Sequence, residues 1–270
     1  MSIITISRGS YSKGKEIAEK VATKLGYECV SRDILLEASE QFNTPEIKLV
    51  RALHDAPSVL NRFSHGKERF VAYIQEALLT HLQRDNVVYH GLAGHFFLDG
   101  VSHSLKVRII SDLHDRVKLE MERETISEEQ ALKILKKDDD ERRRWSMTLY
   151  GMDTTDTSLY DLCIHVRTIS VSDAVQIICH TAQLPNFQTT KESQQTLDDL
   201  ALSAKVRSAL VGSWPDAKVS AERGRVMIDA EAPRLKEAKV CDQIAAIARE
   251  VPGVADVRVS ASPSAFLGFE

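Results

Sequence analysis

The chain has 270 residues, a formal net charge of -4 at pH 7, and 43% apolar and 27% charged residues. This length favours two folded units, each with its own core. The near-balanced charge gives no sign of a nucleic-acid partner. No apolar run approaches the ~20 residues that span a bilayer, and the first residues lack the pattern of an export signal. We therefore expect a cytoplasmic protein without a transmembrane segment.

The first elements in chain order are a strand, a glycine-containing loop and a helix. Ile3, Ile4 and Ile6 form a short β-branched run without charge, which is typical of a strand buried on both faces. After the loop, apolar residues recur at helical spacing from Ile17 to Leu25, and Gly26 predicts the end of the helix.

The same alternation continues as far as about residue 185. A helical period runs from Phe70 to Leu82, and two apolar runs at 87–91 and 105–111 predict strands. A charged amphipathic helix is expected at 114–124, and Ser127 with Gln130 predicts a capping box for the next helix. A last strand at 161–166 precedes a helix capped by Ser170 or Ser172. The predicted fold class is α/β, with a mostly parallel sheet between helices in three layers.

The composition changes near residue 184, where a polar stretch without periodicity begins. We place the first unit at residues 1–185, a linker at 186–196, a second unit at 197–262 and a short tail at 263–270. The second unit reads as helix, two strands around the turn Arg223-Gly224, a helix and a final strand. It is predicted to be a small α+β domain of order αββαβ.

The loop after the first strand has the glycines and the lysine of a phosphate-binding turn. Gly9, Gly14 and Lys15 occupy the positions GxxxxGK, between a buried strand and a helix N-terminus. Glu16 stands where such loops carry Ser or Thr, whose hydroxyl ligates magnesium. Either Ser10 or Ser12 supplies the hydroxyl instead, or Glu16 points away and stabilises the helix N-terminus.

A second candidate cluster is the sequence DDDERRRW at residues 138–145. Phosphoryl transfer develops charge on the moving group, and arginines on a mobile segment stabilise that charge. Arg142, Arg143 and Arg144 are candidates for this role. The alternative is a solvated helix with acid-base pairs along its surface. Most runs of charged residues belong to helices of this kind. No Cys, His or carboxylate group has the spacing of a metal site, so no protein metal ligand is predicted.

These pieces together resemble the cytidylate-kinase-like family of P-loop nucleotide kinases over roughly residues 3–183. The similarity rests on IITISRG at 3–9, GKEIAEKVATKLGY at 14–27, SRDIL at 31–35, VRIIS with Asp115-Arg116, DDERRRWSMTLYG at 139–151 and SLYDL at 158–162. The resemblance implies the P-loop fold and transfer of the γ-phosphoryl group of ATP, with Mg2+, to a nucleoside monophosphate acceptor.

The resemblance also implies roles for individual residues. The cofactor-binding loop would be Gly9, Ser10, Tyr11, Ser12, Lys13, Gly14, Lys15 and Glu16. Lys15, Arg142 and Arg144 would be catalytic, and Arg32 with Asp33 would meet the acceptor. The sequence departs from the family pattern at Tyr11, where a further glycine is common, at Ser31, where an acidic residue is common, and at Leu92, in place of an acceptor-binding arginine.

Residues 197–262 resemble a BON domain, through the strands around Gly224 and the ending PGVADVRV. The resemblance implies the fold of a module that is proposed to bind phospholipid or other ligands. The segment lacks a basic run, which disfavours binding to an anionic membrane, and a sensor or a dimerisation module is an equal alternative.

Three functions remain open, and they are ranked here in order. The first is a nucleoside monophosphate kinase whose small domain regulates or localises it. The second is a catalytically degenerate nucleotide-binding regulatory protein, which Glu16, Ser31 and Leu92 favour. A purely structural assembly role comes third, because it explains the small C-terminal unit but not the phosphate-binding loop.

Overall fold

The computed structural model describes residues 2–9, 13–31, 65–91, 94–233 and 236–263. In these ranges the first unit is a five-stranded sheet with strand order β2-β3-β1-β4-β5, and every neighbouring pair is parallel. Its strands are β1 (Ile3–Arg8), β2 (Glu28–Ser31), β3 (Val87–His90), β4 (Ser104–Ile110) and β5 (Leu162–His165). Its α-helices are α1 (Gly14–Leu25), α4 (Gly66–Leu82), α5 (Leu113–Glu124), α6 (Glu128–Tyr150) and α7 (Val171–Ala182), with short 3-10 helices at Gly94–Phe97 (η3), Thr157–Leu159 (η4) and Pro185–Phe187 (η5).

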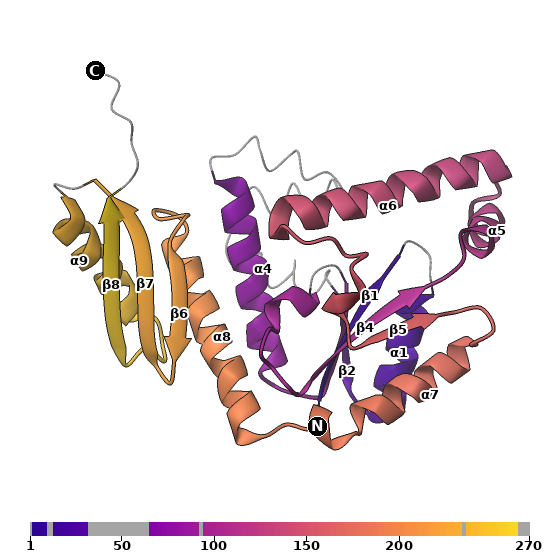
Figure 1. Cartoon of the computed structure of the whole chain (residues 1–270), viewed down its shortest axis with the longest axis horizontal. Coiled ribbons are helices and arrows are strands. Elements are labelled where there is room, and N and C mark those ends of the chain that lie inside the picture. Colours follow the sequence, from indigo (N-terminus) through magenta and orange to yellow (C-terminus); the bar gives the residue numbers. More distant parts are fainter. Residues whose placement is uncertain (1, 10–12, 32–64, 92–93, 234–235, 264–270) are drawn as a thin grey trace.

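Helices cover both faces of this sheet, as the sequence predicts (Figure 1). Alternate residues of β1 face opposite sides, because side chains of a strand alternate. Ile4 and Ile6 pack with α1 and α7, whereas Ile3 packs with α4, the end of α6 and part of α8. The predicted three-layer α/β fold is confirmed by the parallel sheet and the helices on its two faces.

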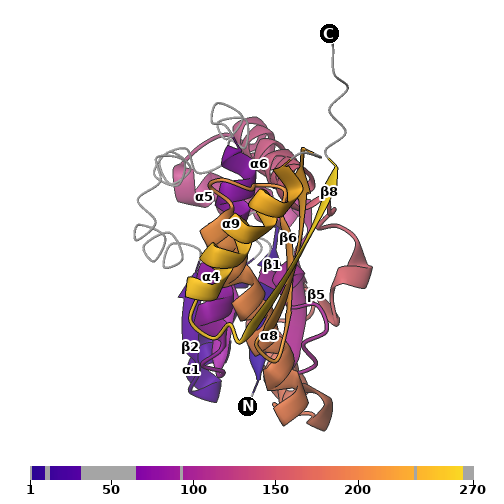
Figure 2. The ribbon, with the colours of Figure 1, turned by 90° about the vertical axis from the view of Figure 1, so that its left-hand side faces the viewer.

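The C-terminal unit has the predicted order αββαβ. It consists of α8 (Lys191–Leu210), β6 (Lys218–Glu222), β7 (Arg225–Ala232), α9 (Glu237–Glu250) and β8 (Asp256–Pro263). β6 and β7 are antiparallel, β7 and β8 are parallel, and the buried residues of β7 alternate from Val226 to Ala232. The two helices pack on this buried face, and α9 lies beside the strands in Figure 2.

Helix α8 begins earlier than the sequence analysis expects. Thr190 and Ser193 form a capping box, so the helix starts at Lys191 and residues 191–196 of the expected linker are helical. The first half of α8 contributes Leu197 and Ala201 to the core of the first unit, and its second half contributes Val206 and Leu210 to that of the second. One helix therefore belongs to both cores, and in Figure 1 it runs between the two units.

No helix among the described residues is long and apolar enough to cross a membrane.

Candidate functional site

The loop between β1 and α1 brings a helix N-terminus to the carboxyl end of the sheet. A Cβ on Gly14 would lie 2.7 Å from Cβ of Arg8, so only glycine lets α1 start against the end of β1. Lys13, at the N-cap, has a φ of 62°, and no side chain caps the helix. Its first amides therefore have no intrahelical partner and face the region where a phosphate would bind.

Lys15 and Glu16 lie along the surface of α1. Nζ of Lys15 lies 3.8 Å from Oε1 of Glu19, with 63% of the lysine side chain exposed. Oε1 of Glu16 lies 2.7 Å from Nζ of Lys20. Of the lysines in the loop motif, it is Lys13 that lines a pocket at this edge of the sheet. Glu16 thus has the second of its two expected geometries, pointing away along the helix.

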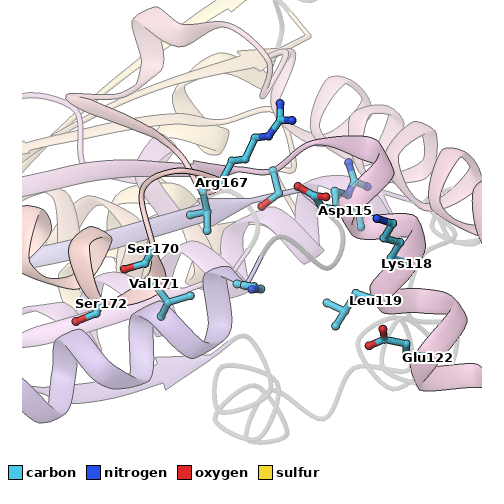
Figure 3. Close-up of a pocket in the computed structure, with 12 residues that line it drawn as sticks. Asp115, Lys118, Leu119, Glu122, Arg167, Ser170, Val171 and Ser172 are labelled. Atoms are coloured by element: carbon cyan, nitrogen blue, oxygen red, sulfur yellow. The ribbon is translucent and has the colours of Figure 1, made fainter.

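The larger of two adjoining pockets has a volume of about 600 Å³. Figure 3 shows Asp115, Lys118, Leu119 and Glu122 on α5, across the opening from Arg167 and the start of α7. The full lining is Lys13, Ser111, Asp115, Arg116, Lys118, Leu119, Glu122, Val166, Arg167, Ser170, Val171 and Ser172. Its walls are the α1 N-terminus, α5 and the loop between β5 and α7.

The second pocket, of about 290 Å³, is rich in arginine and is called the arginine pocket below. It is lined by Arg8, Gly9, Arg108, Ile110, Ser111, Arg116, Asp139, Asp140, Arg142, Arg143, Thr154 and Thr155. Five guanidinium groups against two carboxylates give the lining a net positive charge, which suits an anion with several oxygens.

Arg116 joins the two pockets, since its side chain lines both. It comes from α5 and reaches Asp139 of α6, with 2.7 Å between Nη2 and Oδ2 and only 10% of the arginine side chain exposed. Nη1 lies 3.8 Å from the position that a Cβ on Gly9 would take. Its Nε is buried and makes no hydrogen bond within the described ranges. Arg116 therefore places a desolvated cation beside the loop.

A hydrogen-bond network beneath the arginine pocket holds Arg108. Nη1 of Arg108 donates to the hydroxyl of Tyr160 at 3.2 Å, and its guanidinium lies 5.4 Å from the centre of the same ring. The Tyr160 hydroxyl also contacts Oγ of Ser7 at 3.2 Å and the carbonyl of Thr154 at 3.0 Å. The ring of His95 lies 4.7 Å from that of Tyr160.

His95 is neutral in this environment. The pKa of His95 falls from 6.5 to about 3. Burial is the largest cause, and the nearby cations Lys106 and Arg108 act in the same direction. Its Nε2 is buried without a hydrogen bond among the residues described. The neutral ring packs under the site without adding to its positive charge.

The arginine run on α6 divides between two sides of the helix. Arg142 and Arg143 line the arginine pocket, whereas Arg144 is exposed and lines neither pocket. Arg143 pairs with Asp153, with 2.6 Å between Nη2 and Oδ2. Helix α6 is held by the capping box of Ser127 and by the buried side chain of Trp145.

Several predicted site residues lie outside the described residues. These are Ser10, Tyr11 and Ser12 of the loop, Arg32 and Asp33 of the acceptor region, and Leu92. Conversely, the sequence analysis assigns no role to Arg8, Arg108, Arg116 or Arg167, which line the two pockets. A signal was available for Arg8 and Arg167, which stand at or just after the carboxyl end of a parallel strand, where such sheets bind ligands. Arg108 lies within β4 and Arg116 within α5, so this signal does not mark them.

The fold and the site define a P-loop-type α/β protein with two adjoining polar pockets at the carboxyl edge of its sheet. The model of the cytidylate kinase-like family matches residues 3–168, more than half of the chain, so the chain belongs to that family. The match leaves the C-terminal unit outside it.

The chain is similar to several solved structures, and the alignment with a TM-score above 0.5 shows a shared fold. A protein of Eubacterium ventriosum, described as uncharacterized, aligns with a TM-score of 0.52 at 20% identity, covering 67% of this chain and 98% of that one. Shikimate kinase from Bacteroides thetaiotaomicron aligns with a TM-score of 0.41 at 10% identity over 68% and 99% of the two chains. Dephospho-CoA kinase from Campylobacter jejuni gives 0.37 at 17% identity over 67% and 97%. The search of curated proteins found no match.

Proposed function

We propose that the protein is an ATP-dependent kinase that transfers a γ-phosphoryl group to a nucleoside monophosphate. The observation that carries this proposal is the position of Arg116, which lines both pockets and lies next to Gly9 of the loop. A group moving from a donor in one pocket to an acceptor in the other would pass this cation. Family membership supports the same reading.

In this proposal ATP occupies the larger pocket. Its base lies between Leu119 of α5 and Val171 of α7, and its phosphates extend toward Lys13 and Arg116. The amides at the start of α1 and the positive end of that helix hold the phosphate oxygens. The donor set thus fits a polyphosphate.

Magnesium fits the same site through the substrate. The described residues contain no cluster of three candidate metal ligands, and Mg2+ commonly binds through phosphate oxygens, water and one or two carboxylates. Asp115 and Asp140 line the two pockets and are the carboxylates that would hold it. When bound, the ion supplies charge neutralisation on the phosphates.

The acceptor phosphate lies in the arginine pocket. An oxygen of this phosphate attacks the γ-phosphorus, the bond to the β-bridging oxygen breaks, and the electron pair leaves with ADP. Arg8, Arg108 and Arg142 hold the acceptor and stabilise charge on the moving group. Catalysis of this kind depends on positioning and charge more than on a base, which suits a pocket of fixed guanidinium groups.

A second candidate is a nucleotide-responsive regulator that binds without transfer. The observation that favours it is the ion pair of Lys15 with Glu19, which turns the lysine of the motif away from both pockets. In that case residues 197–262, which we propose to be a BON-like module, would respond to the nucleotide that is bound to the first unit.

The two candidates separate in one assay on the purified full chain. ATP and Mg2+ are incubated with each nucleoside monophosphate, and ADP release is measured beside nucleotide-dependent thermal stabilisation. We expect ADP release with at least one acceptor. Stabilisation without ADP release would support the regulator, and neither signal would contradict both.

Two pairs of variants locate the site. Lys13→Ala should weaken ATP binding at least about fivefold, whereas Lys15→Ala should change it less, because only Lys13 lines the pocket. Arg142→Gln should lower ADP release by about 100-fold, whereas Arg144→Gln, which removes an exposed guanidinium, should not. Equal effects within each pair would contradict the assignment.

A further inference from the structure

A third pocket lies where the two units meet, and we call it the junction pocket. Its volume is about 420 Å³, within the range of small-molecule sites. Helix α4 provides Glu68 and Gln75, α8 provides Ser203, Ala204 and Arg207, and the segment entering β6 provides Pro215, Asp216, Ala217, Lys218 and Val219. It shares no residue with the two pockets at the sheet edge.

Arg207 is the residue that makes this pocket a candidate binding site. Its Nε is buried and has no hydrogen-bond partner in the described part of the chain. Nη1 donates to Oε1 of Gln75 at 3.4 Å, which is near the limit for a hydrogen bond. No ion pair of Arg207 occurs among the described residues, although the charge of Glu68 acts on it.

Burial of such a group has a cost, and the long hydrogen bond to Gln75 is the one hydrogen bond of the Arg207 side chain among the described residues. Burial lowers the pKa of Arg207, because removing a guanidinium from water disfavours its charged form. The N–H groups of a buried guanidinium are normally paired, by protein, water or a bound ion, and Nε of Arg207 is not. An oxyanion in the junction pocket would supply the missing acceptors in the planar geometry that arginine prefers.

The other polar groups narrow the class of ligand. Lys218 adds a second cation to the lining, and Glu68 and Asp216 add two carboxylates. A bare anion would be repelled by these carboxylates, but hydroxyl groups donate to them, as ribose hydroxyls do to acidic side chains in nucleotide-binding proteins. We propose that the junction pocket binds a phosphate monoester of a small polyhydroxylated compound, with the phosphate at Arg207 and Lys218 and the hydroxyls at Glu68 and Asp216.

The pocket is connected to the arginine pocket through α4 and α6. Glu68 stands two residues before Phe70, whose ring lies 5.6 Å from that of Trp145 in α6. Trp145 follows Arg142 by three residues on the same helix. A ligand that orders the start of α4 therefore also acts on the helix that carries Arg142. This second step rests on the proposed function, since its readout is ADP release.

The first experiment measures binding without ATP, so that it does not depend on kinase activity. Ribose 5-phosphate, inorganic phosphate and ribose are titrated into the full chain by calorimetry. We expect ribose 5-phosphate to bind at least tenfold more tightly than either of the other two. Equal affinities for ribose 5-phosphate and inorganic phosphate, or no binding of ribose 5-phosphate, would overturn the proposal.

Variants then place the ligand. Arg207→Met should reduce the affinity for ribose 5-phosphate at least tenfold, and Lys218→Met, at an exposed position, should reduce it without affecting folding. Arg249→Met removes the same charge from an exposed site on α9 and should leave binding unchanged. Arg142→Gln should also bind as the wild type does. Loss of binding in Arg142→Gln alone would put the ligand in the arginine pocket and refute the proposal.

Thermal unfolding gives an independent check. Without ligand, Arg207→Met should unfold at or above the wild-type temperature, because a methionine replaces a partly desolvated charge that has one long hydrogen bond. Ribose 5-phosphate should raise the unfolding temperature of the wild type and of Arg249→Met but not of Arg207→Met. A ligand-free Arg207→Met that unfolds well below the wild type would mean that Arg207 is structural, and would overturn the proposal. Where turnover is established, ribose 5-phosphate should change its rate about fivefold or more, and Lys218→Met should remove the effect.

Discussion

Replacement of His95 by phenylalanine should make the protein less sensitive to acid. His95 lies under the arginine pocket with 4% of its surface exposed, between the rings of Phe96 and Tyr160 and near the cations Lys106 and Arg108. Its pKa falls from 6.5 in a solvated chain to about 3 in the fold. The unfolded chain therefore binds a proton at mildly acid pH that the folded protein does not.

The direction and size of the effect follow from this difference. The contribution of neutral His95 is fully present above pH 6.5 and is lost as the pH falls from there toward about 3. Each pH unit in that window removes about 1.4 kcal/mol from the free energy of unfolding. At pH 4.5 the loss from this one residue would be on the order of 2–3 kcal/mol, a large part of a typical domain's stability.

The assay is urea unfolding of wild type and His95→Phe at several pH values from 7.5 to about 4.5. Phenylalanine keeps a ring among Phe96 and Tyr160 but does not titrate, so the wild-type curve should fall more steeply. His103, which is also buried with a lowered pKa, contributes equally to both proteins and cancels in the difference. His114→Phe, the same change at an exposed site, should leave the slope unaltered. Parallel pH profiles for wild type and His95→Phe would refute the reasoning.

Three further predictions test the site and the shared helix. Arg116→Met should lower the free energy of unfolding by about 1.5–3 kcal/mol, because Asp139 loses a charged partner at 2.7 Å, and should lower ADP release by about 100-fold. Urea unfolding and single-turnover assays measure the two effects, and wild-type turnover would exclude a role in transfer. Glu16→Gln should change the free energy of unfolding by less than about 1 kcal/mol and leave the affinity for ATP unchanged, since the partner of Glu16 is the exposed Lys20. Titration calorimetry measures the affinity. A large gain in affinity would show that the carboxylate faces the phosphates. Leu197→Ala should lower the free energy of unfolding by about 2–5 kcal/mol and lower the melting temperature of both units together. Scanning calorimetry should therefore show one transition. Two separated transitions would mean that α8 does not couple the units.

Local signals in the sequence were sufficient for most of the fold. The capping box at Ser127 is present, Ser170 is the one of the two candidate caps that begins α7, and the left-handed Gly26 ends α1. The turn Arg223-Gly224 has positive φ at both residues, and a Cβ on Gly224 would lie 3.2 Å from a backbone oxygen. Such features depend on a few neighbouring residues, so a linear pattern contains them.

The start of α8 shows where a local pattern is insufficient. Residues 191–196 are polar because the first turns of α8 extend beyond most of the core. A polar stretch without periodicity resembles a linker, so the sequence analysis places the linker there. The buried Ser193, which hydrogen-bonds the equally buried His103 at 2.8 Å, anchors this end of the helix. That contact joins residues 90 positions apart and has no counterpart in the local sequence.

By itself the sequence determined the order of strands and helices and the membership of a family, because each depends on residues close together in the chain. It also predicted the position of a phosphate-binding loop. Only the tertiary structure decided which cations share a pocket. It separated Lys13 from Lys15 and Arg142 from Arg144, and it brought Arg108 to Tyr160 and Arg116 to Asp139. The physical reason is that the direction of a side chain depends on the face of the helix or strand it occupies and on the partner packed there, and that partner comes from a distant part of the chain.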